Sequence, residues 1–142
     1  MNINDCLRKR WLIKESPDLE KAKQSVEISK AKFQEAELAL KANLIESAIV
    51  FSYASMFHAG RALLFKDGFR EKGHVPLLIY LEEKYPLAIG KKLLFDFNTM
   101  RLERHDSLYG LKPDYGKKEA EYAVETAKLF LEKVAKILGM QK

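Results

Sequence analysis

The sequence predicts an all-α protein, an antiparallel four-helix up-and-down bundle with extra short helices. In the long segments, apolar residues recur at alternating spacings of three and four, which is the periodicity of one helix face. No segment shows sustained alternation of apolar and polar residues with turn glycines, so no strand is expected. The connections between the long segments are short or moderate, which favours antiparallel neighbours.

The first long helix is predicted to start at Ser16 and Pro17 and to reach about Lys41. A serine oxygen can accept hydrogen bonds from the free N–H groups of a first turn, and proline fits the first helical position. The apolar stripe of this helix consists of Ala22, Val26, Ser29, Phe33, Ala36 and Leu40. An extra helix is expected before it, over residues 4–13.

The second long helix is predicted to open at Asn43 and to close at Gly68, which suits the left-handed position after a helix. It is apolar around most of its circumference, so it should be the most buried helix. Its apolar positions are Ile45, Ile49, Tyr53, Met56, Phe57, Leu63 and Leu64.

The second half of the chain predicts three more helices after a polar connection at residues 69–74. A short helix begins at Val75 and Pro76 and is stopped by Pro86, which disfavours helical geometry at the residue before it. A longer helix is expected over about residues 88–109. A turn-rich segment then leads to a last amphipathic helix, which starts after Gly116 and is ended by Gly139.

The composition is that of an ordinary globular chain. Of its 142 residues 47% are hydrophobic and 32% charged, and four prolines and seven glycines are too few for a disordered chain. The net charge of +5 is spread along the sequence, so it permits a polyanionic partner without requiring one. A solvated Lys/Glu-rich surface explains it equally well.

The sequence indicates a cytoplasmic protein without a membrane partner. No segment reads as long and apolar enough to cross a bilayer, and no apolar region follows the basic residues near the N-terminus as in a secretory signal. The single cysteine, Cys6, cannot form an internal disulfide, a zinc site or a redox pair. It is expected to fill space in an apolar environment.

Two motifs resemble the HEPN domain family. The segment from Ser52 to Leu64, followed by Gly68 and by Lys72, Gly73 and His74, is similar to the second helix and following loop of HEPN domains. The segment from Arg104 to Gly110 resembles the arginine motif of that family. Tyr115, Gly116 and the last helix look like those of small stand-alone prokaryotic members. The resemblance covers about residues 18–138, which we take as the core of one domain spanning 1–142.

The resemblance implies a helical bundle that is usually a homodimer. Many HEPN proteins are metal-independent ribonucleases whose paired arginine motifs line a cleft at the dimer interface. Others are partner subunits of a small nucleotidyltransferase, in toxin–antitoxin pairs or as substrate-binding subunits. We therefore expect a non-catalytic or weakly active partner of a separately encoded minimal nucleotidyltransferase. The alternative is a ribonuclease toxin that cleaves RNA without a metal.

The arginine motif departs from the ribonuclease pattern at its histidine position. Counted from Arg104 this position is Tyr109, while a frame from Arg101 to His105 places the histidine one residue too close. A histidine titrates near neutral pH, whereas only about one tyrosine in a thousand is ionised at pH 7. The resemblance still implies Arg104, His105 and Tyr109 as the catalytic candidates.

The same motif supplies the candidate binding residues. Arg101 and Arg104 are expected to bind phosphate or RNA, and Tyr109 is the expected acceptor of AMP from a partner nucleotidyltransferase. The competing structural interpretation pairs both arginines with acids such as Glu103 or Asp106, or with acids of a partner chain, and leaves His105 as a solvated cation at the helix end.

The remaining candidates favour structural roles. His58 is expected in the core or an interface, and His74 lies in the loop where family members often carry a histidine. Three scattered histidines without metal-ligand spacing, and glycines that stand singly, predict neither a metal nor a cofactor. The aromatic residues expected in the core are Tyr53, Phe57, Phe65, Phe95, Phe97 and Phe130.

Overall fold

The computed structural model of the protein describes residues 1–108 and 115–140, with the backbone alone for 105–108. The chain forms six helices and two short strands over this part. In order these are α1 (Ile3–Arg8), β1 (Leu12–Lys14), α2 (Leu19–Lys41), α3 (Ile45–Asp67), β2 (Phe69–Glu71), α4 (His74–Lys84), α5 (Lys91–Leu108) and α6 (Lys117–Ile137). The structure confirms the all-α bundle.

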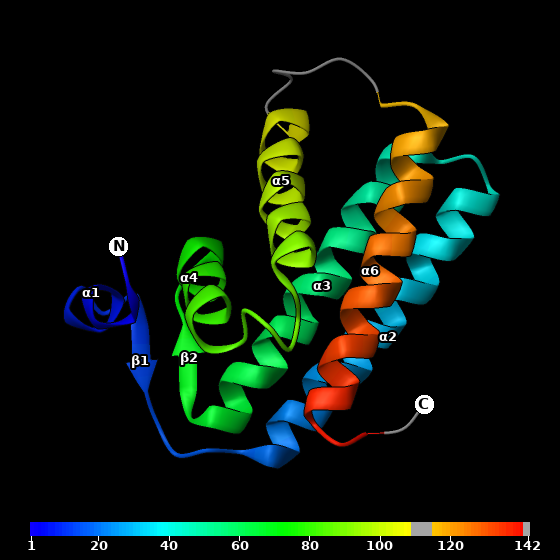
Figure 1. The fold of residues 1–142 in the computed structure, drawn as a ribbon. Coiled ribbons are helices and arrows are strands. Elements are labelled where there is room, and N and C mark those ends of the chain that lie inside the picture. The colour runs from blue at the N-terminus through cyan, green and yellow to red at the C-terminus, as the bar shows by residue number, and fades with distance from the viewer. Residues whose placement is uncertain (109–114, 141–142) are drawn as a thin grey trace.

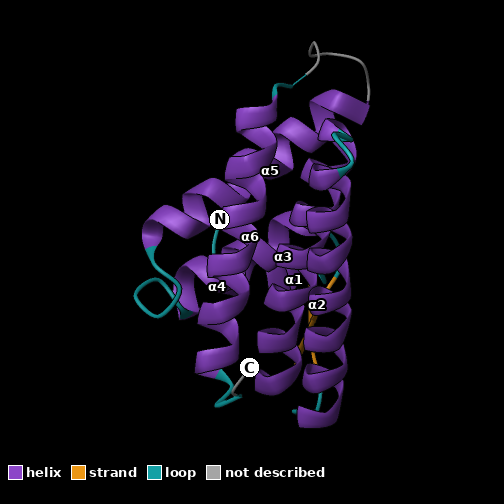
Figure 2. Cartoon of the chain, turned by 90° about the vertical axis from the view of Figure 1, so that its right-hand side faces the viewer, coloured by secondary structure: helices purple, strands orange, loops and turns teal. Residues whose placement is uncertain are grey.

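The long helices pack around α3. A short turn joins α2 to α3, so the two helices run antiparallel and contact each other along their length, and α6 packs against both (Figure 1). Helix α5 contacts α3 and α6, and α4 contacts α3 and α5. Seen from the side, α2 runs along one edge of the molecule with α3 next to it (Figure 2). This arrangement brings α3, α4 and α5 together.

Helix α3 is the centre of the core, as its apolar circumference predicted. Tyr53, Met56 and Leu63 are among its fully buried side chains. By length and composition alone α3 could cross a membrane, which differs from the sequence expectation, but 61% of its most apolar window is buried inside the protein. Its role in this fold is that of a core helix.

Small residues let α2 and α3 approach closely. The hydroxyl of Ser29 donates to the carbonyl of Ser55 at 2.7 Å, and the hydroxyl of Ser55 donates to the carbonyl of Ser29 at 2.9 Å. Both serines are buried, so these reciprocal bonds satisfy polar groups that would otherwise be costly inside the core.

Gly68 ends α3, as predicted, and the conformation there needs glycine. Its φ is +89°, and a Cβ at this position would lie 2.6 Å from the carbonyl oxygen of Glu15. The N–H of Glu15 donates to the carbonyl of Gly68 at 2.9 Å. The close approach turns the chain into β2 and ties the segment before α2 to the end of α3.

The N-terminal prediction of one helix over residues 4–13 and no strand is wrong. Helix α1 ends at Arg8, Arg10 has a φ of +60°, and β1 then pairs antiparallel with β2, Leu12 opposite Glu71. Strands of three residues are too short to show alternation in a sequence. Their pairing joins segments almost 60 residues apart, so it depends on the tertiary fold.

Several helices start a few residues away from the predicted position. The N-cap of α2 is Asp18, whose carboxylate accepts from the N–H of Lys21 at 3.0 Å, so Ser16 and Pro17 precede the helix. The N-cap of α3 is Leu44, because Asn43 adopts a φ of +61°. Helix α4 begins at His74, before Val75 and Pro76, and α5 begins at Lys91 rather than near residue 88.

The predicted boundaries of the last helix hold. Helix α6 starts directly after Gly116, whose N–H donates to the Glu119 carboxylate at 2.9 Å, and Gly139 follows its C-cap with a φ of +72°. One predicted core aromatic is wrong, since Phe95 is 68% exposed on α5. Cys6 is buried against the cluster of core residues, as expected of an apolar filler.

Candidate functional site

Helix α5 carries Arg101 and Arg104 toward the faces of α3 and α4. The guanidinium carbon of Arg104 lies 5.7 Å from the centre of the Tyr53 ring, a cation–π contact. Arg101 donates from Nε and Nη2 to Oδ1 of Asn98 at 3.1 and 3.0 Å. The two arginines are three residues apart on one helix, so their side chains lie on neighbouring positions of one face.

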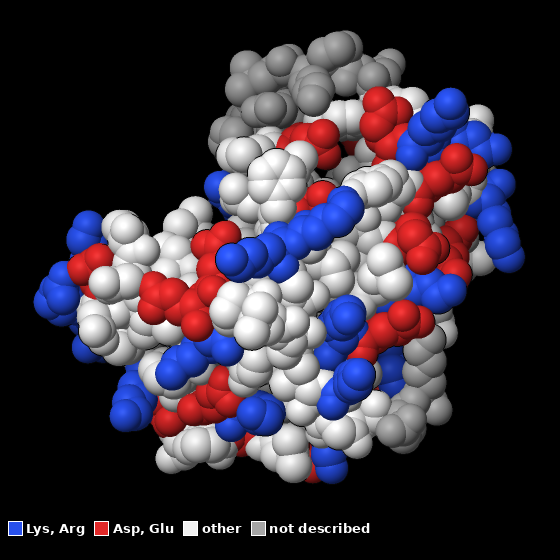
Figure 3. Space-filling model, viewed as in Figure 1, with Lys and Arg blue, Asp and Glu red and all other residues white. Residues whose placement is uncertain are grey.

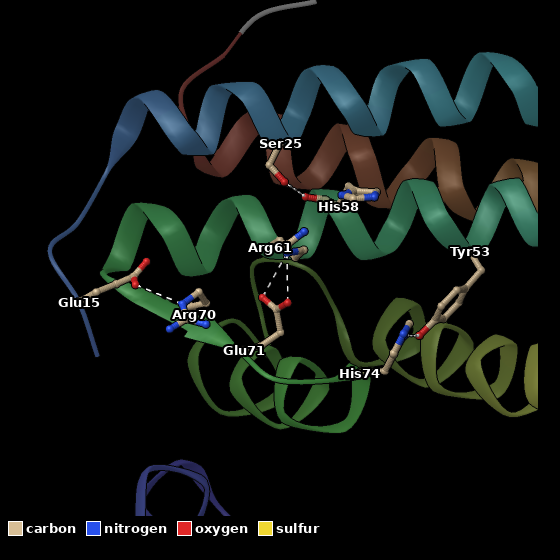
Figure 4. Close-up of polar contacts among 8 residues, drawn as sticks. All are labelled: Glu15, Ser25, Tyr53, His58, Arg61, Arg70, Glu71 and His74. Carbon is tan, nitrogen blue, oxygen red and sulfur yellow. Dashed lines mark hydrogen bonds and ion pairs between the residues drawn. The ribbon is translucent and has the colours of Figure 1, made fainter. Parts of the chain in front are cut away.

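Tyr53 and His74 form the polar centre of this site. The Tyr53 hydroxyl lies 2.5 Å from Nδ1 of His74, and the two rings stack with centroids 5.4 Å apart and an interplanar angle of 19° (Figure 4). Phe57, one turn after Tyr53 on α3, also packs against the imidazole, with its ring centroid 4.4 Å away. Two aromatic rings and one hydrogen bond therefore fix the orientation of His74.

Gly73 places His74 at the start of α4. Its φ of +115° lies in the region that favours glycine, and it forms the N-cap of the helix. A larger residue there would strain the turn that connects β2 to α4. The local backbone therefore explains the glycine between Lys72 and His74. The turn at Gly73 allows the imidazole of His74 to reach Tyr53 on α3.

The protonation states in the site follow from burial and the two arginines. Burial lowers the pKa of His74, and the positive charges of Arg104 and Arg101 lower it further, so the imidazole is uncharged at neutral pH. Burial raises the pKa of Tyr53 far above its ordinary value, and the same arginines oppose that rise only in part. Tyr53 is therefore a neutral phenol that can donate or accept a hydrogen bond.

Arg101 and Arg104 differ from Arg61 and Arg70 in having no carboxylate partner among residues 1–104 and 115–140. Arg61 pairs with Glu71 at 3.1 Å and Arg70 pairs with Glu15 at 3.4 Å (Figure 4). Neither Arg101 nor Arg104 makes an ion pair with a carboxylate within residues 1–104 and 115–140. Two positive charges next to an uncharged histidine form a local excess of positive charge, suited to an anion.

The face of the molecule drawn in Figure 3 gives no such signal. On the face shown in Figure 3, Lys and Arg are interspersed with Asp and Glu, so the positive net charge does not gather there into one basic stripe.

The structure brings together only some of the predicted site residues. Arg101 and Arg104 lie at the site. His105 has its backbone in α5, but its side chain is outside the described residues, as is all of Tyr109. Their catalytic and acceptor roles therefore remain predictions.

His74 and Tyr53 are the residues that sequence reasoning did not place in the site. The loop histidine was a visible signal, because the HEPN resemblance includes it. Its partner was not visible, since Tyr53 lies 21 positions earlier on a helix whose apolar pattern marks it as core.

His58 has a structural role, as expected. Its ring packs edge-on against Phe57 with centroids 5.7 Å apart, and its carbonyl accepts from the hydroxyl of Ser25 at 2.7 Å. Its Nδ1 is buried and makes no hydrogen bond within the described part of the chain. Burial lowers the pKa of His58, as do the nearby charges of Arg61 and Lys32. No group of three or more potential metal ligands was found among the described residues.

Comparison with known proteins identifies the class to which this fold and site belong. The family model of the HEPN domain matches residues 22–138. The chain therefore belongs to the HEPN family, as the two sequence motifs predicted. A search of curated proteins found no match.

Proposed function

We propose that the protein is the partner subunit of a separately encoded minimal nucleotidyltransferase, itself non-catalytic or weakly active, and that it works as a homodimer. Membership of the HEPN family supports this role, because HEPN proteins act as such partners or as ribonucleases. A toxin–antitoxin pair is one setting for the partnership. Arg101 and Arg104 would contact the phosphates of the nucleotide or RNA that the pair handles.

The observation that carries this proposal is the arginine pair beside Tyr53 and His74, which has no carboxylate partner among residues 1–104 and 115–140. Arginine binds phosphate oxygens through several donors and keeps its charge at any physiological pH. Strong catalysis of RNA cleavage also needs a base and an acid at the phosphate. With Tyr109 at the motif's histidine position, the motif supplies cations more readily than proton-transfer groups.

The second candidate function is a metal-independent ribonuclease with Arg104, His105 and Tyr109 as catalytic residues. One observation favours it: burial, and then the charges of Arg104 and Arg101, lower the pKa of His74, so its imidazole is uncharged at neutral pH and available to accept a proton. Under this alternative the homodimer would present two copies of the site to RNA.

The two functions are separated by copurification and by a cleavage assay. The tagged protein is co-expressed with a minimal nucleotidyltransferase from a neighbouring gene, where one is encoded there, and then purified. A stable complex, together with intact RNA when the purified protein is incubated in chelator, is the expected result. Rapid RNA cleavage by the isolated protein without metal would favour the ribonuclease. Absence of any complex would contradict the partner role.

The partner role also predicts a covalent modification. Incubation with the nucleotidyltransferase and ATP should transfer AMP to the hydroxyl of Tyr109, with release of pyrophosphate. Peptide mass spectrometry locates the added nucleotide. Tyr109→Phe removes the acceptor, whereas Tyr122→Phe, a change at an exposed tyrosine of α6, is the matched control and should leave the modification intact. AMP found on another residue would show that the acceptor is wrongly assigned.

A further inference from the structure

We propose that His74 completes an anion site with Arg101 and Arg104, which binds a tetrahedral phosphate group, and that Tyr53 is the residue that positions this histidine. The inference shares with the proposed function only the assumption that the two arginines contact phosphate. It adds a third ligand-binding residue from α4, which the arginine motif does not contain.

The site is assembled from three elements. Tyr53 lies on α3, His74 is the first residue of α4, and the two arginines lie on α5. The Tyr53 ring joins them, because it stacks on the imidazole and carries the guanidinium of Arg104 5.7 Å from its centre. The charges of both arginines act on the imidazole as well as on the phenol. Tyr53 therefore contacts both His74 and Arg104.

Nε2 of His74 is the ring nitrogen that can bind a ligand. Its Nδ1 is taken by the Tyr53 hydroxyl, while within the described part of the chain its Nε2 has no hydrogen-bond partner. His74 is half-buried and is one of the residues that line a shallow pocket with Trp11, Lys72 and Val75, so the residue is partly accessible to solvent. An imidazole held by one nitrogen and open at the other is oriented to donate to an oxygen of an incoming anion.

Tyr53 suits both protonation states of the histidine. When the imidazole is neutral and protonated on Nε2, the phenol O–H donates to Nδ1. When the imidazole gains a proton, Nδ1–H donates to the phenol oxygen. The hydrogen bond survives in either state, and because Tyr53 is buried its hydroxyl does not exchange this partner for water.

Binding of an anion should therefore be coupled to uptake of a proton. In the free protein, burial and Arg104 and Arg101 keep the pKa of His74 low; the other charged group at its pocket is Lys72, and Tyr53 is neutral. A bound dianion offsets the positive field and accepts a hydrogen bond from imidazolium, so the pKa of His74 rises. By linkage, affinity for the dianion increases as pH falls through the pKa of the bound form, at most about tenfold per pH unit.

The test uses sulfate, a tetrahedral dianion that does not itself titrate between pH 5 and 8. Histidine side-chain signals of the whole protein are followed by NMR across this pH range, with and without sulfate. We expect the pKa of His74 to rise on binding, while that of His58 changes little. Titrations with 5′-AMP then ask whether a phosphate monoester binds at the same signals.

Variants connect the response to the named residues. Arg104→Gln and Arg101→Gln should each weaken sulfate binding about tenfold, whereas Arg70→Gln, which alters an arginine already paired with Glu15, should leave it unchanged. His74→Asn should remove the pH dependence of binding. Tyr53→Phe should keep the fold but weaken the coupling between sulfate binding and protonation of His74, because it leaves Nδ1 of His74 without its hydrogen-bond partner.

Each outcome bears on the inference separately from the proposed function. Sulfate binding with an unchanged pKa of His74 would overturn the role of the histidine, and no sulfate binding at all would overturn the site. If sulfate binds as expected but no nucleotidyltransferase copurifies, the anion site stands and the partner role fails. If the complex forms equally well with Arg104→Gln and sulfate does not bind, the partner role stands and the anion site fails.

Discussion

The hydroxyl of Tyr53 lies 2.5 Å from Nδ1 of His74, and this contact fastens the first residue of α4 to the middle of α3. Both rings also pack on aromatic neighbours, His74 on Phe57 and Tyr53 on Phe97. The pair therefore has a structural effect as well as a place in the anion site, and the two can be measured separately.

The first prediction concerns the stability that this hydrogen bond provides. Tyr53→Phe keeps the buried ring and removes only the hydroxyl, which leaves a half-buried imidazole nitrogen unpaired. We expect a loss of about 1–3 kcal/mol in the free energy of unfolding, measured by urea denaturation. Tyr122→Phe is the control. The Tyr122 hydroxyl also donates a hydrogen bond, to Asp96, but Tyr122 is 51% exposed, so this substitution should lower the free energy of unfolding by less.

A second prediction concerns Asp67 at the end of α3. Its carboxylate accepts hydrogen bonds from the hydroxyls of Tyr80 and Tyr85 at 2.8 and 2.6 Å and pairs with Lys66 at 3.0 Å. Burial acts to raise the pKa of Asp67, but these hydrogen bonds outweigh it and leave the pKa below its ordinary value of 3.8. The ionised carboxylate is therefore bound more favourably in the folded state than in the unfolded chain.

The sign of the pH dependence follows from this lowered pKa. The stabilisation is fully present above the unfolded-state pKa near 4, and it is lost as pH falls from about 5 through the lower folded-state pKa. Asp67→Asn should reduce stability by about 1–3 kcal/mol at pH 7 and should flatten the decline between pH 5 and pH 3. Chemical denaturation at several pH values measures both effects. An unchanged acid limb in the variant would show that other carboxyls cause the decline.

The third prediction is a symmetric dimer with α5 near the twofold axis. Phe97 and Met100 of α5 are buried within the protomer, and the exposed large apolar residues among the described side chains of this helix are Phe95 and Leu102. They are 68% and 48% exposed and lie seven residues apart, two turns along one face. Phe95→Glu should convert a dimer into a monomer at micromolar concentration, as measured by light scattering.

Leu38→Glu on α2 is the matched control for this substitution. Leu38 is 66% exposed, close to the exposure of Phe95, but it lies on a different helix. A wild-type protein that is already monomeric, or a dimer disrupted equally by both variants, would contradict the placement of α5 at the axis.

The sequence predicted the features that depend on local periodicity and on single residues with strong conformational preferences. The apolar circumference of α3 and the left-handed end at Gly68 are of this kind. Phe95 shows the limit of such reasoning. It is two residues from Phe97, and residues two apart on a helix point about 200° apart, so one buried face cannot hold both. Apolar character alone did not decide which of the two is buried.

The site was only half visible in the sequence. The arginine motif lies on one helix and could be read directly, so Arg101 and Arg104 were candidates from the sequence alone. The contact between Tyr53 and His74 depends on how α4 is placed against α3, which the Gly73 turn and the packing of Phe57 determine. Contacts between side chains of different helices, and the pairing of β1 with β2, depend on the tertiary fold. Neither produces a periodic pattern in the sequence.

The last prediction concerns RNA cleavage and distinguishes a cation that stabilises charge from a group that moves a proton. If the protein cleaves RNA in chelator, Arg104→Ala should lower the rate about a hundredfold or more, because a preorganised cation acts most strongly as charge develops on the phosphate. Tyr109→His should raise cleavage near neutral pH, since histidine titrates there and tyrosine does not. Arg70→Ala is the control. Wild-type cleavage that resists Arg104→Ala would place the active site elsewhere, whereas inactivity of both wild type and Tyr109→His would leave the partner-subunit role as the better account.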